Sequence, residues 1–405
     1  MTVRRTARRG VAILLAVLAA LPVTVPAARA GTIRVVDDDG RGTAASCDAT
    51  AATFKRIQKA VDASGSGDTV RVCPGVYAER VSITGARSGL LLVASTPLGA
   101  TIRDPGGWAS PQPPVVAIGA VSGVTVRGFR IRALTDATYD AWDTDGIVAT
   151  GATSVTIRGN HVSWSGPGGW SELADGIVAR GGTTGVIRAN TVVDATNAGI
   201  VVGDPVDAGT SVTVRGNTVQ ALFPGINSAE PPVLALFAGW GISVTNAGAT
   251  ITGNTVTGKT VYGLNTTMGY GIEVTHGTGF GGAPSTIAAN AVTGATVGIR
   301  ARGLDHVLTE NTVISRQTAI SLANLDSGVV GPGNVAKATW SSAGSIWVSG
   351  DSDGNLITGN DFRTSPGTDC TDAGGTPLGN AWTDNLGADA SPVGICAPPS
   401  PPPPN

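Results

Sequence analysis

The sequence is poor in aromatic, charged and metal-binding side chains. Only 4% of its 405 residues are aromatic and 14% are charged, and it has three histidines, two methionines and four cysteines. Histidines and methionines this few and scattered do not form a copper site, and the chain has no zinc-binding spacing, nucleotide-binding loop or Gly-x-Ser-x-Gly motif. Leucine is sparse, which argues against leucine-rich repeats.

Long hydrophobic runs are confined to the start of the chain. Arginines at four positions between residues 4 and 9 precede an apolar stretch over residues 11–26, and Ala28-Arg29-Ala30 has the small-x-small form of a cleavage site. The apolar stretch is too short and too interrupted to span a bilayer. We therefore predict a secretion signal peptide over residues 1–30, an extracellular mature chain that begins near Gly31, and no membrane span.

The charge balance argues against nucleic acid as a partner. Five of the 27 Lys and Arg and none of the 29 acidic residues lie in the predicted signal peptide, which leaves the mature chain with a net charge of −7. A nucleic-acid-binding protein would need a basic face.

The dominant pattern is a two-part repeat with a period of roughly 20 to 30 residues, which is typical of a solenoid whose coils bury their apolar faces against one another. The first part is a small residue followed by isoleucine, at Gly146-Ile147, Gly176-Ile177, Gly199-Ile200, Gly241-Ile242, Gly271-Ile272, Gly298-Ile299, Ala319-Ile320 and Ser345-Ile346. The second part is a β-type run that ends in asparagine, at Asn160, Asn190, Asn217, Asn254, Asn290, Asn311, Asn334 and Asn360.

The local pattern within one repeat indicates strands. Val155, Ile157 and Val162 alternate with polar residues, and a period of two belongs to strands rather than helices. Val and Ile suit parallel strands around a packed interior. We expect the repeated asparagines to take the left-handed turn conformation and to bond, through their amides, to the equivalent asparagine of the next coil.

From about residue 50 to residue 365 the chain resembles the right-handed parallel β-helix proteins of the pectin-lyase-like superfamily. The run from Phe54 to Val61 is similar to the helix that caps such a solenoid, with Phe54, Ile57 and Val61 on one helix face. The resemblance implies an all-β fold, a single-stranded right-handed parallel β-helix solenoid with an N-terminal capping helix. The superfamily includes lyases, hydrolases, epimerases, transferases, adhesins and copper-delivery proteins, so it implies little about activity.

We assign residues 31–396 to this β-helix domain and residues 397–405 to a proline-rich tail. The four cysteines form two local pairs near the two ends of the domain. A solenoid holds its ends far apart, so only the local pairing can close. We predict the disulfides Cys47–Cys73 and Cys370–Cys396.

The longest insertions fall in one turn of the repeat, the turn before the small-residue–isoleucine strand. They span residues 133–145, 164–175, 220–240 and 257–270, and we expect them to wall a groove over those strands, where the resemblance places the substrate. Sugar rings stack on aromatic faces and bond to polar groups. The candidate substrate-binding residues are Tyr139, Trp142, Trp164, Trp170, Trp240 and Tyr270, with Glu273, Arg300 and Arg302 further along the same face.

Asp145 and Asp175 each precede a Gly-Ile pair on adjacent coils. Their carboxylates are expected roughly 5 to 7 Å apart, the range of paired acids in glycoside cleavage. The run from Asp143 to Ile147 is similar to the Asn-Thr-Asp-Gly signature of polygalacturonases, which implies that Asp145 is an acid or base. The other signatures of that family are absent. The alternative role for both residues is to cap the turn before each strand.

A second mechanism stays open. No cofactor is required for hydrolysis, but Asp140, Asp143, Glu172 and Asp175 are hard oxygen ligands suited to Ca²⁺. Resemblance to pectate lyases implies a bound Ca²⁺ and a basic residue that removes a proton, for which Arg180 is the candidate.

We therefore expect a secreted enzyme that cleaves an extracellular polysaccharide by hydrolysis or β-elimination. The alternative is a non-catalytic β-helix that binds glycans at the cell surface. The oligomeric state stays open, a homotrimer included.

Overall fold

The computed structural model describes residues 31–38, 47, 54–106, 112–134, 144–165, 174–207, 209–220, 239–258, 269–277, 282–340, 344–363, 366–373 and 379–397. The predicted signal peptide and all but the first residue of the predicted tail lie outside these ranges. Within them, no helix has both the length and the apolar character needed to cross a membrane.

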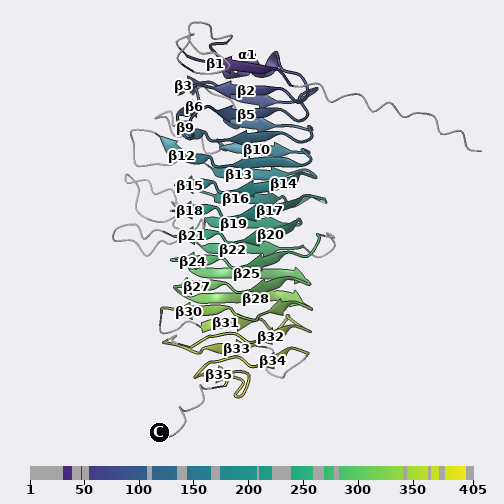
Figure 1. The fold of residues 1–405 in the computed structure, drawn as a ribbon. Coiled ribbons are helices and arrows are strands. Elements are labelled where there is room, and N and C mark those ends of the chain that lie inside the picture. The colour runs from purple at the N-terminus through teal and green to yellow at the C-terminus, as the bar shows by residue number, and fades with distance from the viewer. Residues whose placement is uncertain are drawn as a thin grey trace, which may run out of the picture. The chain divides into compact units, whose positions relative to one another are not determined.

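Three parallel sheets run side by side along the solenoid, and successive coils add strands to each of them (Figure 1). Sheet A has the order β1 (Ile33–Val36), β2 (Thr69–Val72), β5 (Leu91–Ala94), β8 (Thr125–Arg127), β11 (Val155–Arg158), β14 (Thr184–Arg188), β17 (Ser211–Arg215), β20 (Gly248–Thr252), β23 (Thr286–Ala288), β26 (Val307–Thr309), β29 (Val329–Val330), β32 (Leu356–Thr358) and β34 (Ala381–Thr383).

Sheet B comprises β3 (Gly75–Ala78), β6 (Ala100–Arg103), β9 (Arg130–Leu134), β12 (His161–Ser165), β15 (Thr191–Val193), β18 (Thr218–Gln220), β21 (Thr255–Thr257), β24 (Ala291–Thr293), β27 (Thr312–Ser315) and β30 (Val335–Ala338). Sheet C comprises β4 (Val81–Ile83), β7 (Val116–Ile118), β10 (Ile147–Thr150), β13 (Asp175–Arg180), β16 (Ala198–Gly203), β19 (Trp240–Thr245), β22 (Tyr270–Thr275), β25 (Val297–Leu304), β28 (Thr318–Asp326), β31 (Gly344–Val348), β33 (Cys370–Asp372) and β35 (Ala390–Ser391).

The Gly-Ile pairs set the register of sheet C. Ile147 pairs with Ile177, and the isoleucine of each following repeat pairs with the next, through to Ile346. All of these isoleucines are fully buried in the core. The first six of these isoleucines follow a glycine, which is needed for space: a Cβ on Gly271, for example, would collide with Cγ1 of Val292 and with the carbonyl oxygen of Gly298. Close packing inside the coil therefore explains why the first part of the repeat begins with a small residue.

The predicted asparagine ladder is confirmed at the turn from sheet A to sheet B. The Asn160 side-chain amide donates to Oδ1 of Asn190 at 3.1 Å, and the contact repeats from coil to coil until Asn360 donates to Asn385 at 2.8 Å. The expectation that these asparagines are themselves left-handed is wrong. Positive φ falls on the residue before them, such as Gly159 with φ 61° and Ala189 with φ 51°. The preceding residue thus makes the turn, and the asparagine side chain forms hydrogen bonds to the asparagine of the next coil.

The capping helix is α1 (Ile57–Asp62), and Ile57 and Val61 are fully buried against the first coils. Phe54 is not on the helix face as expected but lies before the helix, bridged to Val36 of β1. Both oxygens of the buried Glu79 accept hydrogen bonds from the first helical N–H groups, those of Ile57 at 2.7 Å and Gln58 at 3.0 Å. This carboxylate anchors the helix to the solenoid.

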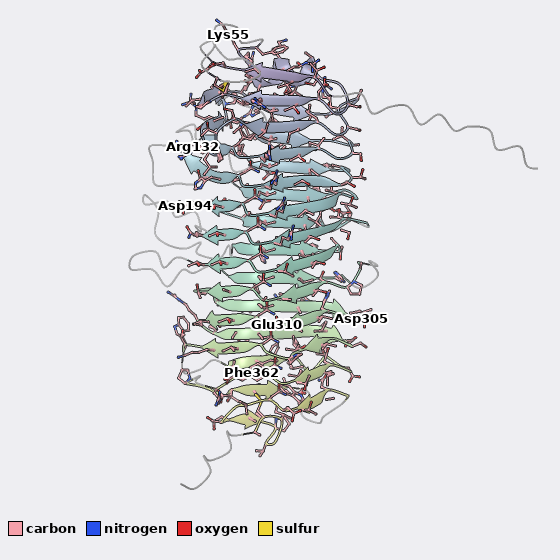
Figure 2. The ribbon with its side chains drawn as sticks, viewed as in Figure 1. Lys55, Arg132, Asp194, Asp305, Glu310 and Phe362 are labelled. Atoms are coloured by element: carbon pink, nitrogen blue, oxygen red, sulfur yellow. A yellow bond between two sulfur atoms is a disulfide. The ribbon has the colours of Figure 1, made fainter. Side chains whose placement is uncertain are left out.

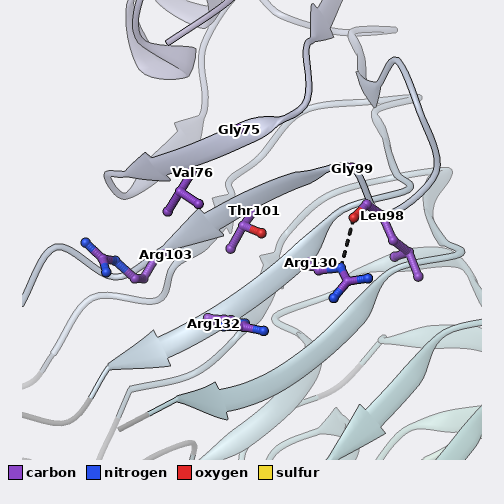
Figure 3. Close-up of a pocket in the computed structure, with 8 residues that line it drawn as sticks. All are labelled: Gly75, Val76, Leu98, Gly99, Thr101, Arg103, Arg130 and Arg132. Carbon is purple, nitrogen blue, oxygen red and sulfur yellow. Dashed lines mark hydrogen bonds between the residues drawn. The ribbon is translucent and has the colours of Figure 1, made fainter. Parts of the chain in front are cut away.

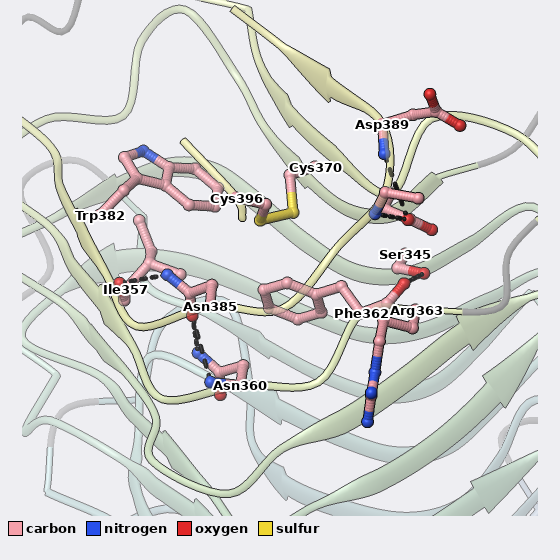
Figure 4. Close-up of a disulfide and its surroundings, with 12 residues drawn as sticks. Ser345, Ile357, Asn360, Phe362, Arg363, Cys370, Trp382, Asn385, Asp389 and Cys396 are labelled. Atoms are coloured by element: carbon pink, nitrogen blue, oxygen red, sulfur yellow. Dashed lines mark hydrogen bonds between the residues drawn. A yellow bond between two sulfur atoms is a disulfide. The ribbon is translucent and has the colours of Figure 1, made fainter. Parts of the chain in front are cut away.

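Both predicted disulfides are present. Cys47–Cys73 joins Cα atoms 5.4 Å apart, and Cys370–Cys396 joins Cα atoms 6.3 Å apart. The second lies in the last coils, near the end of the asparagine ladder and the buried Phe362 (Figure 4). Each disulfide therefore fixes a terminal region in which the core has a neighbouring coil on one side only.

Candidate functional site

The four long insertions share one place in the repeat. Each connects a strand of sheet B to a strand of sheet C: β9 to β10, β12 to β13, β18 to β19, and β21 to β22. Their expected bounds were too wide, because Ala133, Trp164, Trp240 and Tyr270 all belong to strands. Six candidate residues of these turns lie outside the described residues: Tyr139, Asp140, Trp142, Asp143, Trp170 and Glu172. The side chain of Trp164 also lies outside them.

The outward face of sheet C carries a connected group of four side chains, which we call the aromatic–ion-pair cluster: Trp240, Tyr270, Glu273 and Arg300. Trp240 begins β19, Tyr270 begins β22, and these two residues are paired in the sheet. Glu273 of β22 is paired with Arg300 of β25. The neighbouring Ile272 and Val274 are fully buried, so alternation along β22 sends Glu273 outward.

Hydrogen bonds join the cluster across three coils. Nη1 of Arg300 donates to Oε1 of Glu273 at 3.2 Å and to the Tyr270 hydroxyl at 2.8 Å. The indole N–H of Trp240 donates to the other carboxylate oxygen of Glu273. The Trp240 and Tyr270 rings stack with centroids 6.3 Å apart and planes 15° apart, and the Arg300 guanidinium carbon lies 5.1 Å from the Tyr270 centroid.

The cluster is partly shielded from water, with exposed side-chain fractions of 24% for Arg300 and 13% for Glu273. Charge-assisted hydrogen bonds are stronger in such surroundings than on an open surface. Arg300 makes both of its contacts through Nη1, and the Tyr270 hydroxyl, which accepts from Arg300, keeps a proton that it can donate. The cluster thus presents cationic and hydroxyl donors beside two aromatic rings.

Asp145 and Asp175 lie on adjacent coils at the start of sheet C, as their spacing predicts. The Asp175 backbone N–H donates to Oδ1 of Asp145 at 3.2 Å. Oδ1 of Asp175 accepts from the Ala198 N–H at 2.9 Å and from the Asn197 side-chain amide at 2.8 Å. Both carboxylates therefore bond to the start of the following coil, the capping role named as the alternative, and their catalytic role stays a prediction.

Two predicted cationic residues lie apart from these carboxylate contacts. Arg180 is exposed at the far end of β13. Arg302, half-buried on β25, is paired with Thr275 and belongs to the same strand as Arg300. Among the described residues no group of three or more His, Cys, Asp or Glu side chains is arranged to hold a metal ion. The Ca²⁺ hypothesis depends on Asp140, Asp143 and Glu172, which lie outside those residues.

Comparisons with known proteins agree with this geometry. A protein family described as "Right handed beta helix region" matches residues 118–279. In fold, the chain is similar to the A-module of mannuronan C-5 epimerase AlgE6 from Azotobacter vinelandii, with a TM-score of 0.60 and 15% identity over 82% of this chain and 89% of that one. The protein is a right-handed parallel β-helix.

A second solved structure is similar to this β-helix, the A-module of mannuronan C-5 epimerase AlgE4 from the same organism. Its TM-score is 0.54 and its identity 15%, and the likeness covers 83% of this chain and 91% of that one. No curated protein matches the sequence.

The β-helix also holds a histidine pair that the sequence analysis did not connect. His276 follows β22, His306 follows β25, and their rings meet edge to face with centroids 4.4 Å apart. Nδ1 of His306 accepts from the Ser285 N–H at 3.1 Å, and its Nε2 lies 3.0 Å from the Arg302 carbonyl oxygen. Burial, and then the charge of His276, lowers the pKa of His306 to about 4, while burial lowers that of His276.

The two histidines lie just beyond the C-terminal ends of β22 and β25, the strands that contain Tyr270, Glu273 and Arg300. His276 is the third residue after Glu273, and His306 the sixth after Arg300. The position of each histidine shortly after a charged residue of two neighbouring repeats was the sequence signal that could have linked them.

Asp305, next to His306, and Arg132 of sheet B lie on opposite edges of the solenoid (Figure 2).

Proposed function

We propose that this β-helix is an extracellular enzyme that binds a polysaccharide along the outward face of sheet C and cleaves it at the aromatic–ion-pair cluster. The observation that carries the proposal is that four side chains from three successive coils form one connected group on that face. The two disulfides are compatible with an extracellular location.

The chemistry of the cluster fits a sugar. Trp240 and Tyr270 stack across neighbouring coils, so their rings follow the long axis of the solenoid, along which a polymer can lie. Arg300 can bind a carboxylate, and the Tyr270 hydroxyl can bond to a ring or glycosidic oxygen. The similar solved structures are modules of mannuronan epimerases, which supports a polysaccharide as the substrate class by analogy of fold.

Of the two mechanisms, the cluster favours β-elimination from a uronate. Strands β19, β22 and β25 contain a single carboxylate, Glu273, whereas hydrolysis uses a pair. In the proposed reaction Arg300 binds the uronate carboxylate and Glu273 takes the proton from the adjacent carbon. The bond to the glycosidic oxygen then breaks, and Tyr270 donates its proton to that oxygen.

Tyr270→Phe tests this mechanism. It removes the proposed proton donor and keeps the ring, so we expect turnover to fall by about 10²- to 10⁴-fold on a uronan while the thermal midpoint stays near that of the wild type. Unsaturated products, followed by ultraviolet absorbance, and reducing ends would be measured on uronan, fructan and neutral polysaccharides. Arg215→Gln, an exposed substitution on sheet A, is the control. Unchanged turnover in Tyr270→Phe would refute the assignment.

Non-catalytic glycan binding is the rival function, and one observation favours it. Both oxygens of Glu273 already accept hydrogen bonds from protein groups, as they would in a rigid binding platform. Under this reading the wild-type protein binds a glycan of the panel and releases neither unsaturated products nor reducing ends.

A further inference from the structure

A hollow of about 410 Å³ lies on sheet B in the N-terminal coils, on a different sheet from the aromatic–ion-pair cluster. Three guanidinium groups line it, those of Arg103 on β6 and of Arg130 and Arg132 on β9 (Figure 3). Val76 and Thr101 also face the hollow, and Val76 is 56% exposed. The site thus combines positive charge with an apolar and a hydroxyl-bearing surface.

Strand register explains why the three arginines gather. Arg103 pairs with Arg132, and Thr101 pairs with Arg130. Neighbouring strands are about 4.8 Å apart, and residues two apart on one strand share a face about 7 Å apart, so the three side chains start from one small area. Like charges this close repel unless an anion lies between them.

The described residues supply no carboxylate to these arginines. Asp104, the nearest in sequence, instead pairs with Arg80 at 2.8 Å and caps the Gly106 N–H at 3.0 Å. Arg130 donates from Nε to the carbonyl oxygen of Leu98 at 2.9 Å. Nε of Arg103 and Nε of Arg132 are buried without a hydrogen-bond partner among the described residues, a feature they share with Arg127 of sheet A.

The pKa of His161 depends on the positive charge of the same arginines. It lies on β12, paired with Arg130, and the next strand, β15, contains no charged residue. Burial, followed by the positive charges of Arg130 and Arg132, lowers the pKa of His161. The positive charges of Arg130 and Arg132 therefore act on a neighbouring side chain as well as on the hollow.

We propose that this hollow is a second ligand site, which binds the carboxylate or sulfate groups of an acidic oligosaccharide. Guanidinium groups match both oxyanions through paired N–H donors, while Val76 and Thr101 offer contacts to the sugar ring. Among the described residues that line the hollow none is aromatic, so they offer no stacking platform of the kind that single-stranded nucleic acids use. The site would hold a charged chain on the flank of the solenoid, apart from the cluster on sheet C.

The test uses the full chain with an oligouronate, a sulfated oligosaccharide and inorganic sulfate in calorimetric titrations at low salt. Arg132→Gln and Arg103→Gln should each weaken binding of an acidic oligosaccharide by about tenfold or more. Arg188→Gln is the matched control, since Arg188 lies in a column of stacked arginines on sheet A, paired with Arg158 and Arg215. An equal loss in this control would reduce the site to general attraction between charges and overturn the proposal.

Nuclear magnetic resonance of His161 makes the test local. A bound anion should raise its pKa, because it offsets Arg130 and Arg132, and the rise should persist in Arg300→Gln, which alters only the cluster. Loss of the rise in Arg300→Gln, or no rise with either oligosaccharide, would overturn the proposal whether or not the protein cleaves polysaccharides. Inorganic sulfate that binds as tightly as the oligosaccharides would overturn the assignment to a sugar.

Discussion

Two segments of the outward face of sheet C use acidic side chains in different ways. Before β10 and at the start of β13, the short carboxylates of Asp145 and Asp175 bond to backbone N–H groups at the start of the next coil. On β22 the longer side chain of Glu273 reaches past the backbone to Trp240 and Arg300. Alignment on neighbouring coils therefore does not fix what an acidic side chain contacts; its length decides whether it bonds to the backbone or to other side chains.

Glu273→Gln should have the largest effect on activity. It keeps the size of the side chain but removes the proposed base, so we expect turnover on a uronan to fall by about 10²- to 10⁴-fold. The amide oxygen can accept from only one of Trp240 and Arg300, so the free energy of unfolding should also fall, by about 1–3 kcal/mol. Glu310→Gln makes the same substitution at an exposed turn and should leave turnover unchanged. If Glu273→Gln cleaves normally and Asp175→Asn does not, the comparison is reversed and the Asp145–Asp175 segment is the active one.

Acid should destabilise the cluster segment before the aspartate segment. His306 has a pKa of about 4 in the folded chain and about 6.5 when unfolded, so the unfolded chain takes up the proton first as pH falls. Stability is full above about pH 6.5 and decreases toward pH 4, by about 3 kcal/mol at most. At pH 5, hydrogen-exchange protection relative to the intrinsic exchange rate should fall in β22 and β25 more than in β10 and β13. An equal fall in protection in both segments, or the same pH dependence in His306→Asn, would contradict this.

Asp175→Ala should lower stability more than activity. The substitution removes the acceptor of the Asn197 side-chain amide and the shorter of two hydrogen bonds of the Ala198 N–H, which still donates to the Ala174 carbonyl oxygen at 3.3 Å. We expect a cost of about 1–3 kcal/mol in the free energy of unfolding. Chemical denaturation measures this cost, with Asp351→Ala at an exposed turn as the control. A stable Asp175→Ala protein without turnover would instead support the catalytic role predicted for Asp175.

The sequence was sufficient to predict the features that repeat. The Gly-Ile pairs gave the register of sheet C, and the asparagines gave the ladder, because both sit at one fixed place in every coil. Glu273 and Arg300 were expected on the same face of the solenoid, and they form an ion pair at 3.2 Å. The left-handed residue was misassigned because several small or polar residues, such as Gly159 and Ala189, fill that position in place of one recurring type.

Features that occur once were harder to predict. Trp240 and Tyr270 were assigned to insertions because each insertion was taken to run up to the residue before a Gly-Ile pair, yet they begin β19 and β22 and so stack on each other. The histidine pair was missed because each member comes from a different coil and the repeat has no histidine column. Arg103 and Arg132 likewise belong to ordinary alternating strands, and only the pairing of β6 with β9 brings them together.

Trp240→Phe should have the smallest effect and would show how the cluster is held. Phenylalanine keeps a ring that can stack on Tyr270 but loses the indole N–H that bonds to Glu273. One hydrogen bond to a partly buried carboxylate contributes about 1–3 kcal/mol, and since Arg300 still binds Glu273 we expect the lower end of that range in the free energy of unfolding. If Glu273 is the base, freeing one of its oxygens should raise or preserve turnover, while glycan affinity falls only slightly. A loss of turnover with the ring stacking intact would mean that the indole N–H positions the Glu273 carboxylate. Glu273 would then need its bond to Trp240, just as Asp145 and Asp175 are held by their backbone contacts.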